Sequence, residues 1–261
     1  MSNRSLFLKE AKSHSESFMT TIIVIPARWG SSRFPGKPLA MLGGKPLIQW
    51  AWERAMECKR AKKVVVATDD QRIFDVVKGF GGEPLMTKSS HLSGTDRVAE
   101  VAALYKADRY VNFQGDEPFL PGKEIDRLIE GMGAAPIATL ARKLMEDSER
   151  KNPNVVKVVC DVDGFAIYFS RAPIPFLKNK TINYSLQAHV GIYAFSSWAL
   201  QKFISLPYGI LEQVESLEQL RAIENRIPIR VVSTAYQTVA IDTPEDLSKA
   251  DQMLKHNKEL L

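Results

Sequence analysis

Apolar, mostly β-branched runs alternate with amphipathic helical patterns over the first half of the chain. Strands that alternate with helices at this spacing are typical of βαβ units, and they predict a mostly parallel sheet flanked by helices. The strand-like runs are TTIIVIPA (20–27), KKVVVATDD (62–70) and RYVNFQGDEP (109–118). The helical patterns are KPLIQWAWERAME (45–57), TDRVAEVAALYKA (95–107) and KEIDRLIEGM (123–132).

The pattern changes after Ala134, where strand-like runs follow one another directly. Asp163 and Gly164 lie between two of these runs and predict a turn, so we expect an antiparallel part after the parallel one. The runs are APIATLARKL (135–144), NVVKVVCD (154–161), GFAIYFSR (164–171) and AHVGIYAF (188–195).

Two helices and a strand are expected to close the chain. The segment 227–234, IPIRVVST, predicts the strand, and the last helix should begin with Thr243 as N-cap and Pro244 as its first residue. The first of these helices is predicted over 210–226, because apolar residues recur there at helical spacing. Those residues are Ile210, Val214, Leu217, Leu220 and Ile223.

The length and composition fit one α/β domain with a sizeable core. The chain has 261 residues, of which 45% are hydrophobic, and no apolar run reaches the about 20 residues that a membrane span needs. Residues 1–19 lack an apolar stretch long enough for a secretory signal, and their polar character predicts a disordered extension. We therefore predict a cytoplasmic protein without a membrane partner. Cys58 and Cys160 are too few and too far apart for a disulfide framework, and both are expected to be buried thiols.

The net charge of +5 is concentrated at the start of the chain. Residues 1–39 carry +4 of it, and the rest is nearly balanced, with no basic stripe between aromatic residues. Nucleic acid is therefore not an expected partner, whereas a local anion site is.

The candidate anion site is the loop PARWGSSRFPGKPL (26–39), which follows the first predicted strand. It brings Arg28, Arg33 and Lys37 together among glycine, serine and proline residues. Open α/β sheets bind ligands at the carboxyl ends of their strands, where loop N–H groups also face the ligand, so the loop fits a triphosphate. A solvated basic surface turn is the alternative, but Pro35 and Pro38 stiffen the backbone around Lys37, which favours oriented phosphate binding.

The two common phosphate-binding glycine motifs do not describe this loop. Gly30 and Gly36 enclose five residues, and Pro38 after Lys37 has no hydroxyl for Mg²⁺, so the loop is not a Walker A motif. A G-x-G-x-x-G fingerprint is absent from the loop, and the GFGG stretch (79–82) follows a helical pattern rather than a strand.

Two acidic residues follow predicted apolar runs and form a candidate metal site. In NFQGDEP (112–118) a predicted strand ends in Asp116 and Glu117, and Asp242 lies between a short apolar run and the last helix. Mg²⁺ typically takes one or two carboxylates together with substrate phosphates and water. Asp242 could instead serve only as a cap or dipole partner of the helix, so the spacing alone leaves both interpretations open.

Nine collinear blocks resemble the 3-deoxy-manno-octulosonate (Kdo) cytidylyltransferases, the CMP-Kdo synthetases. The resemblance covers nearly all of the chain from about residue 20 to about residue 250. The chain differs in its N-terminal extension, in Trp29 where the family has Tyr, and in a short segment before His189. The blocks are IPARWGSSRFPGKPL, VVVATDD, SGTDRVAEV, NFQGDEP, NPNVVKVV, YFSRAPIP, HVGIYAF, LEQLR and DTPEDL.

The resemblance implies a Rossmann-like nucleotidyltransferase fold in one domain, residues 20–261. Residues 20–134 would bind the nucleotide, and the antiparallel part, 135–261, would contribute to the sugar site and the dimer interface. The implied enzyme is a Mg²⁺-dependent homodimer of lipopolysaccharide biosynthesis that converts CTP and Kdo to CMP-Kdo and pyrophosphate.

The resemblance also implies roles for individual residues. The implied nucleotide-binding residues are Arg28, Ser32, Arg33, Lys37, Ser93, Gly94, Arg97 and Gln114. The implied sugar-binding residues are Gln114, Arg171, His189, Glu218 and Gln219, and the implied catalytic residues are Arg28, Lys37, Asp116 and Asp242, the last two as ligands of Mg²⁺. Residues alone leave other interpretations open: a strand-edge charge for Arg171, a satisfied core histidine for His189, and a polar helix face for Glu218 and Gln219.

Two other functions remain open from sequence. Sialic acid cytidylyltransferases perform the same chemistry on another sugar acid, although the QGDEP and DTPEDL blocks favour Kdo. A nucleotide-binding or sensor module without turnover could use the same cations. Release of pyrophosphate distinguishes that module from an enzyme.

Overall fold

The computed structural model describes residues 19–30, 34–179, 181–182 and 184–256. The predicted N-terminal extension, residues 1–19, lies outside these residues except for Met19. Among the described residues, no helix has both the length and the hydropathy to cross a membrane.

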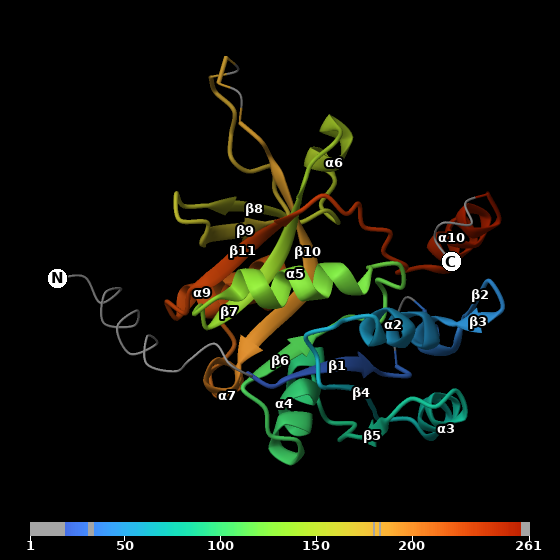
Figure 1. Ribbon diagram of the computed structural model, residues 1–261. Helices are drawn as coiled ribbons and strands as arrows, with labels where there is room; N and C mark the ends of the chain where they lie inside the picture. The colour runs from blue at the N-terminus through green and yellow to red at the C-terminus, as the bar shows by residue number, and fades with distance from the viewer. Residues whose placement is uncertain (1–18, 31–33, 180, 183, 257–261) are drawn as a thin grey trace.

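A mostly parallel sheet forms the centre of the molecule (Figure 1). Its strand order is β11-β7-β10-β6-β1-β4-β5, and β10 runs antiparallel to both of its neighbours, β6 and β7. The remaining neighbours pair in parallel. The α/β prediction is therefore confirmed. The strands are β1 (Thr21–Ala27), β4 (Lys63–Thr68), β5 (Pro84–Met86), β6 (Arg109–Asn112), β7 (Ile137–Lys143), β10 (Gln187–Ser196) and β11 (Ile229–Thr234).

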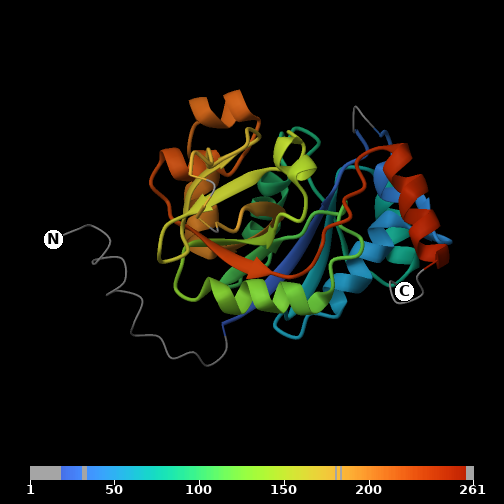
Figure 2. The same cartoon turned by 90° about the horizontal axis from the view of Figure 1, so that it is seen from above.

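Helices cover both faces of this sheet because the buried strands are apolar on both sides (Figure 2). In β1, Ile23 and Ile25 face one helical layer, whereas Ile22 and Val24 face the other. The first layer holds α2 (Leu47–Met56), α3 (Gln71–Gly79) and α5 (Gly122–Met132), and the second holds α4 (Gly94–Leu104), α7 (Ser197–Ile204) and α9 (Leu220–Glu224).

The antiparallel part is a hairpin attached to β10. Strands β8 (Lys157–Cys160) and β9 (Ala166–Ser170) pair with each other, and β8 also pairs with β10. The predicted turn is confirmed: Gly164 has φ +77°, which favours glycine, and its N–H donates to the Asp161 carbonyl at 3.1 Å. Helix α6 (Asp147–Lys151) precedes the hairpin.

The single helix predicted over 210–226 is wrong. The segment forms α8 (Ile210–Glu215) and α9, separated by Ser216 in the left-handed conformation at φ +51°. The break allows the Arg221 guanidinium of α9 to donate to the Glu212 carboxylate of α8, and both residues are buried. Ile210 therefore stays 75% exposed instead of facing the core.

The last helix, α10 (Pro244–His256), begins as predicted. Thr243 accepts a hydrogen bond from Asp246 N at 3.2 Å, and Asp246 accepts one from Thr243 N at 3.0 Å. Leu254 and Ala250 of α10 pack on Trp50 of α2. This packing fixes the segment that leads into α10. Helix α10 also contacts β2, one of three short elements that precede α2. They are η2 (Lys37–Leu39), β2 (Met41–Leu42) and β3 (Lys45–Pro46).

The two cysteines differ in burial. Cys58 is buried as predicted, and burial with a hydrogen bond to Asp126 raises the pKa of its thiol to about 12. Cys160 is only half-buried, so its predicted burial is wrong. It is the last residue of β8, and the second half of this strand, Val159 and Cys160, is incompletely covered.

Candidate functional site

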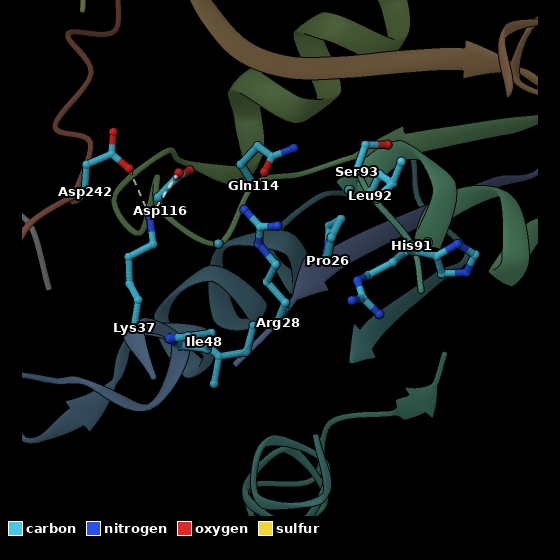
Figure 3. Close-up of a pocket in the computed structure, with 15 residues that line it drawn as sticks. Pro26, Arg28, Lys37, Ile48, His91, Leu92, Ser93, Gln114, Asp116 and Asp242 are labelled. Atoms are coloured by element: carbon cyan, nitrogen blue, oxygen red, sulfur yellow. Dashed lines mark hydrogen bonds and ion pairs between the residues drawn. The ribbon is translucent and has the colours of Figure 1, made fainter. Parts of the chain in front are cut away.

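A pocket of about 220 Å³ opens at the carboxyl ends of β1 and β6 and at the start of α4. In Figure 3, Asp116 and Asp242 lie on one side of the pocket and Ser93 lies on the other. Gln114 lies between them. The residues that line it are Pro26, Ala27, Arg28, Lys37, Pro38, Ile48, His91, Leu92, Ser93, Gly94, Arg97, Gln114, Gly115, Asp116 and Asp242.

The first loop folds back on Trp29. Gly36 N donates to the Trp29 carbonyl at 3.0 Å, and Gly36 has φ +72°. A Cβ added to Gly36 would lie 2.9 Å from the Trp29 ring, so this contact requires glycine. The Arg72 guanidinium lies 3.3 Å from the centre of the same ring. These contacts with Trp29 fix the position of Gly36, and Lys37, the next residue, is the first residue of η2.

Lys37 hydrogen-bonds both carboxylates that were predicted as metal ligands, those of Asp116 and Asp242. Its Nζ donates to Asp116 Oδ2 at 3.3 Å, to Asp242 Oδ1 at 3.2 Å and to the Ile241 carbonyl at 3.0 Å (Figure 3). Ile241 N in turn donates to the Asp116 carbonyl at 2.9 Å. These bonds bring the loop after β6 and the segment before α10 together, although they lie far apart in the sequence.

The donor set at this point fits a magnesium ion. Asp116, Asp242 and the Ile241 carbonyl offer oxygen atoms within reach of one cation, since a single ammonium already contacts all three. Mg²⁺ prefers oxygen ligands and needs only one or two carboxylates when phosphates and water complete its coordination. Within the described part of the chain, no group of three or more His, Cys, Asp or Glu side chains could form a self-sufficient metal centre. The pair is therefore suited to a metal that arrives with its substrate.

Glu117, next to Asp116, is a buried acid that was not among the predicted site residues. Burial and the neighbouring Asp116 raise the pKa of Glu117 to about 8. Glu117 is therefore mostly neutral at pH 7, and the negative charge of this wall is concentrated on Asp116 and Asp242.

The opposite wall is the amino end of α4. Ser93 caps this helix: its Oγ accepts from Asp96 N at 3.1 Å, and its N donates to Asp96 Oδ2 at 3.0 Å. The cap orients Ser93 and Gly94 at the pocket, where the helix end favours an anionic or hydrogen-bonding ligand.

Arg97 lines the same wall, but its guanidinium is buried. It donates to Asp69 Oδ2 at 2.6 Å, to Thr87 Oγ1 at 2.7 Å and to the Lys88 carbonyl at 3.1 Å. These bonds tie α4 to the ends of β4 and β5. Arg97 therefore supports the wall of the pocket through this network.

Arg28 and Gln114 complete the centre of the pocket. The Arg28 side chain is exposed and extends toward Gln114 (Figure 3). Gln114 Nε2 donates to Asn112 Oδ1 at 3.1 Å, and a Cβ added to Gly94 would lie 3.4 Å from the same nitrogen. Ser32 and Arg33, the other predicted residues of the first loop, lie outside the described residues.

Three of the predicted sugar-site residues gather behind this pocket, around Tyr193. Glu218 and Gln219 line a second, smaller cavity together with Tyr193 and Thr95. The His189 ring lies 5.3 Å from the Tyr193 ring, measured between centroids. Glu218 Oε1 and Gln219 Nε2 are buried and have no hydrogen-bond partner among the described residues.

His189 is half-buried and neutral. Burial lowers the pKa of His189 to about 3, and its Nε2 lies 2.9 Å from Thr139 Oγ1. Its ring also packs edge-on against Phe169, at 5.2 Å between centroids. His189 is therefore a half-buried, hydrogen-bonded histidine, and its role in the sugar site stays a prediction.

Arg171 is not brought into either cavity. Its guanidinium donates to the main-chain carbonyls of Glu215 at 2.8 Å, Pro153 at 3.0 Å and Ser216 at 3.2 Å. In this arrangement it connects the hairpin to the turn between α8 and α9. To contact the sugar as predicted, the Arg171 guanidinium would have to give up these hydrogen bonds.

Sequence reasoning missed several residues that shape the site. Tyr193, Thr95 and Asn112 all lie inside the quoted blocks, but they carry no charge and resemble ordinary strand or helix residues. Their position is recognisable only when β6, β10 and α4 are placed next to one another.

Known proteins resemble this chain over most of its length. Residues 22–229 match the family described as cytidylyltransferase. The 3-deoxy-manno-octulosonate cytidylyltransferase of Thermodesulfovibrio yellowstonii is 48% identical over 251 residues, which are 90% of this chain and 98% of the relative. The protein of the same name from Geobacter sulfurreducens is 43% identical over 250 residues, covering 91% and 100%.

Solved structures agree with these relatives. A structure of CMP:2-keto-3-deoxy-manno-octonic acid synthetase complexed with CTP has a TM-score of 0.87 and 44% identity, covering 91% of this chain and 99% of that one. A cytidylyltransferase from Leptospira borgpetersenii, at 19% identity and a TM-score of 0.61 over 92% of this chain and 88% of that one, shares the fold.

Proposed function

The chain belongs to the 3-deoxy-manno-octulosonate cytidylyltransferase family, and on this premise we propose that it transfers CMP from CTP to Kdo. The products are CMP-Kdo and pyrophosphate, and the activated sugar serves lipopolysaccharide biosynthesis. The observation that carries the proposal is the contact of Lys37 with both Asp116 and Asp242 at the edge of the pocket.

The reaction joins the anomeric hydroxyl of Kdo to the α-phosphorus of CTP. The new P–O bond forms as the bond to the β-phosphate oxygen breaks, and the hydroxyl proton leaves to solvent. No side-chain nucleophile is needed, so the protein contributes alignment and charge stabilisation. Lys37 and Arg28 lie where they can contact the triphosphate, and the amino end of α4 forms the facing wall.

We propose that Asp116 and Asp242 hold Mg²⁺ during this reaction. A bound Mg²⁺ would stabilise charge on the phosphate oxygens and lower the pKa of a coordinated hydroxyl. In the structure the Lys37 ammonium lies between the two carboxylates, and we propose that it turns toward the phosphates when Mg²⁺ binds there.

We also propose that the protein is a homodimer in the cytoplasm. Large apolar side chains of the segment between β9 and β10 are exposed, Phe176 by 83% and Ile182 by 64%, and this segment extends away from the sheet (Figure 1). An apolar surface of this kind is typical of an interface between subunits. Sedimentation equilibrium should therefore give twice the mass of the chain, and Phe176→Asp should lower it toward one chain.

The test of the activity is pyrophosphate release in the presence of Mg²⁺. CTP and UTP are each combined with Kdo, a sialic acid and a sugar phosphate, and every mixture is repeated with excess EDTA. Turnover with CTP and Kdo alone, abolished by EDTA, is the expected result. Turnover with another sugar acid would reassign the acceptor, and folded protein that binds CTP without any turnover would contradict the proposed activity.

A further inference from the structure

A chain of side-chain hydrogen bonds links the nucleotide pocket to the second cavity. Gln114 Nε2 donates to Asn112 Oδ1 at 3.1 Å, and Asn112 Nδ2 donates to Thr95 Oγ1 at 3.1 Å. Thr95 Oγ1 then donates to Glu218 Oε2 at 2.8 Å. We name this series, Gln114, Asn112, Thr95 and Glu218, the polar relay.

The two middle members of the relay are buried. Asn112 is 1% exposed and Thr95 is 2% exposed, so water does not compete for their hydrogen bonds. Asn112 is the last residue of β6, and Thr95 is in the first turn of α4. Both are therefore held by regular secondary structure, while Gln114 and Glu218 lie on loops at either end.

The relay has a direction, which fixes what Gln114 presents to the pocket. An amide nitrogen only donates and an amide oxygen only accepts. One N–H of Gln114 Nε2 is used by Asn112 Oδ1, so the Oε1 atom, the acceptor of this amide, remains for a ligand together with the second N–H. Gln114 thus offers an acceptor, suited to a hydroxyl or amino donor of a substrate.

The other end of the relay fixes Glu218, which lies 123 residues from Thr95 in the sequence. With Oε2 bonded to Thr95, Glu218 Oε1 stays buried beside Gln219, whose Nε2 also has no partner among the described residues. Unpaired buried polar atoms are costly, and the cavity beside them, of about 10 Å³, has room for about one water molecule, so a water or a single group of a ligand is expected to bond them.

We propose that Asn112 and Thr95 are positioning residues that couple Gln114 to Glu218 and so align the acceptor sugar with the bound nucleotide. The proposal rests on the proposed transfer of CMP, because it assigns Gln114 to the reacting region and Glu218 to the sugar acid. Neither positioning residue contacts a substrate; each acts through its neighbours.

The test is a set of single substitutions assayed for CTP binding and for transfer to Kdo. Thr95→Val keeps the shape of the side chain but removes the hydroxyl, and Thr95→Ser keeps the hydroxyl. Thr21→Val, at the buried amino end of β1, is the matched control. We expect Thr95→Val to lower kcat/KM for Kdo about 10- to 100-fold, because two buried groups lose their partner.

Three further readouts separate positioning from a general loss of structure. Thr95→Val should leave the dissociation constant of CTP, measured by calorimetry, within about 3-fold of wild type, since Thr95 does not line the nucleotide pocket. Thr95→Ser should restore most of the transfer rate. In a Gln114→Ala background the effect of Thr95→Val should shrink, because coupled residues are not additive.

Other outcomes contradict the relay. Equal kinetics of Thr95→Val, Thr21→Val and wild type would overturn it, as would a strictly additive double variant. If Thr95→Val does not fold, Asn112→Ser is assayed in the same way and must show the same selective loss. Wild-type protein that transfers no CMP to Kdo would instead refute the proposed function, so the two failures are distinguishable.

Discussion

Single side chains carry most of the electrostatic organisation of the site. Lys37 contacts both Asp116 and Asp242, and it also bonds the Ile241 carbonyl. Glu117, directly beside them, is held mostly neutral by burial. Lys37 is therefore the positive charge in direct contact with the two carboxylates, and Arg28 adds a second positive charge to the pocket.

Replacing Lys37 by Met should remove the positive charge of the ammonium group while keeping most of the length of the side chain. We expect kcat to fall about 10²- to 10³-fold, as for the loss of one electrostatic donor at a developing charge. Steady-state pyrophosphate release measures it. Lys45→Met, which removes a half-exposed lysine paired with Glu53 outside the pocket, is the control, and equal rates for the two variants would contradict the role of Lys37.

His189 should make the stability of the protein depend on acid. Burial lowers its folded pKa to about 3, below the ordinary value of 6.5, so the unfolded state binds the proton more readily between these values. The contribution of neutral His189 to the free energy of unfolding is fully present above the ordinary pKa. It decreases as the pH falls from 6.5 toward 3. Between pH 7.5 and pH 5 the loss should be about 2 kcal/mol.

Urea unfolding of wild type and His189→Gln at these two pH values tests this prediction. Glutamine can still bond Thr139 but does not titrate. The variant should therefore lose less stability than wild type on acidification, by about the same 2 kcal/mol. Parallel pH dependences for the two proteins would show that His189 is not the group responsible.

At the level of elements, local sequence signals correctly predicted the turns and helix ends that depend on neighbouring residues. They failed for a helix whose extent depends on contacts between residues farther apart. The Thr243 cap and the Gly164 turn are confirmed because their determinants lie within a few residues. The helix over 210–226 was predicted from spacing, but the buried pair of Glu212 and Arg221 favours a break at Ser216. The sequence alone does not reveal that pairing.

The cap of α10 should affect both stability and the metal site. Thr243→Ala removes the cap and should cost about 1 kcal/mol of unfolding free energy. Asp246, which the cap orients, also accepts from Asp242 N at 3.2 Å, so Asp242 should become less well placed. We expect the Mg²⁺ concentration for half-maximal turnover to rise about 3-fold or more.

Ser196→Ala provides the matched control for this prediction. Ser196 caps α7 by accepting from Ala199 N at 3.1 Å, and it does not line the pocket. It should lose a similar amount of stability in urea with unchanged dependence on Mg²⁺. If both variants show the same Mg²⁺ dependence, the α10 cap does not support Asp242.

At the scale of the whole molecule, the pocket is assembled from segments spread between residues 26 and 242. The sequence predicted its charged members, because cations on a proline-stiffened loop and acids after apolar runs are unusual without a ligand. It could not predict that Arg171 would bond main-chain carbonyls, or that Thr95 and Asn112 would join the two cavities. Those features depend on the order of strands in the sheet.

The central claim is that Asp116 and Asp242 act together on one metal ion that the nucleotide brings to the pocket. The most direct measurement is the rate of pyrophosphate release as a function of Mg²⁺ concentration for wild type, Asp116→Asn and Asp242→Asn at saturating CTP and Kdo. The account predicts that both variants need at least about 10-fold more Mg²⁺ and turn over more slowly, since each loses one charged ligand. Wild-type rates and an unchanged Mg²⁺ requirement in either variant would contradict it.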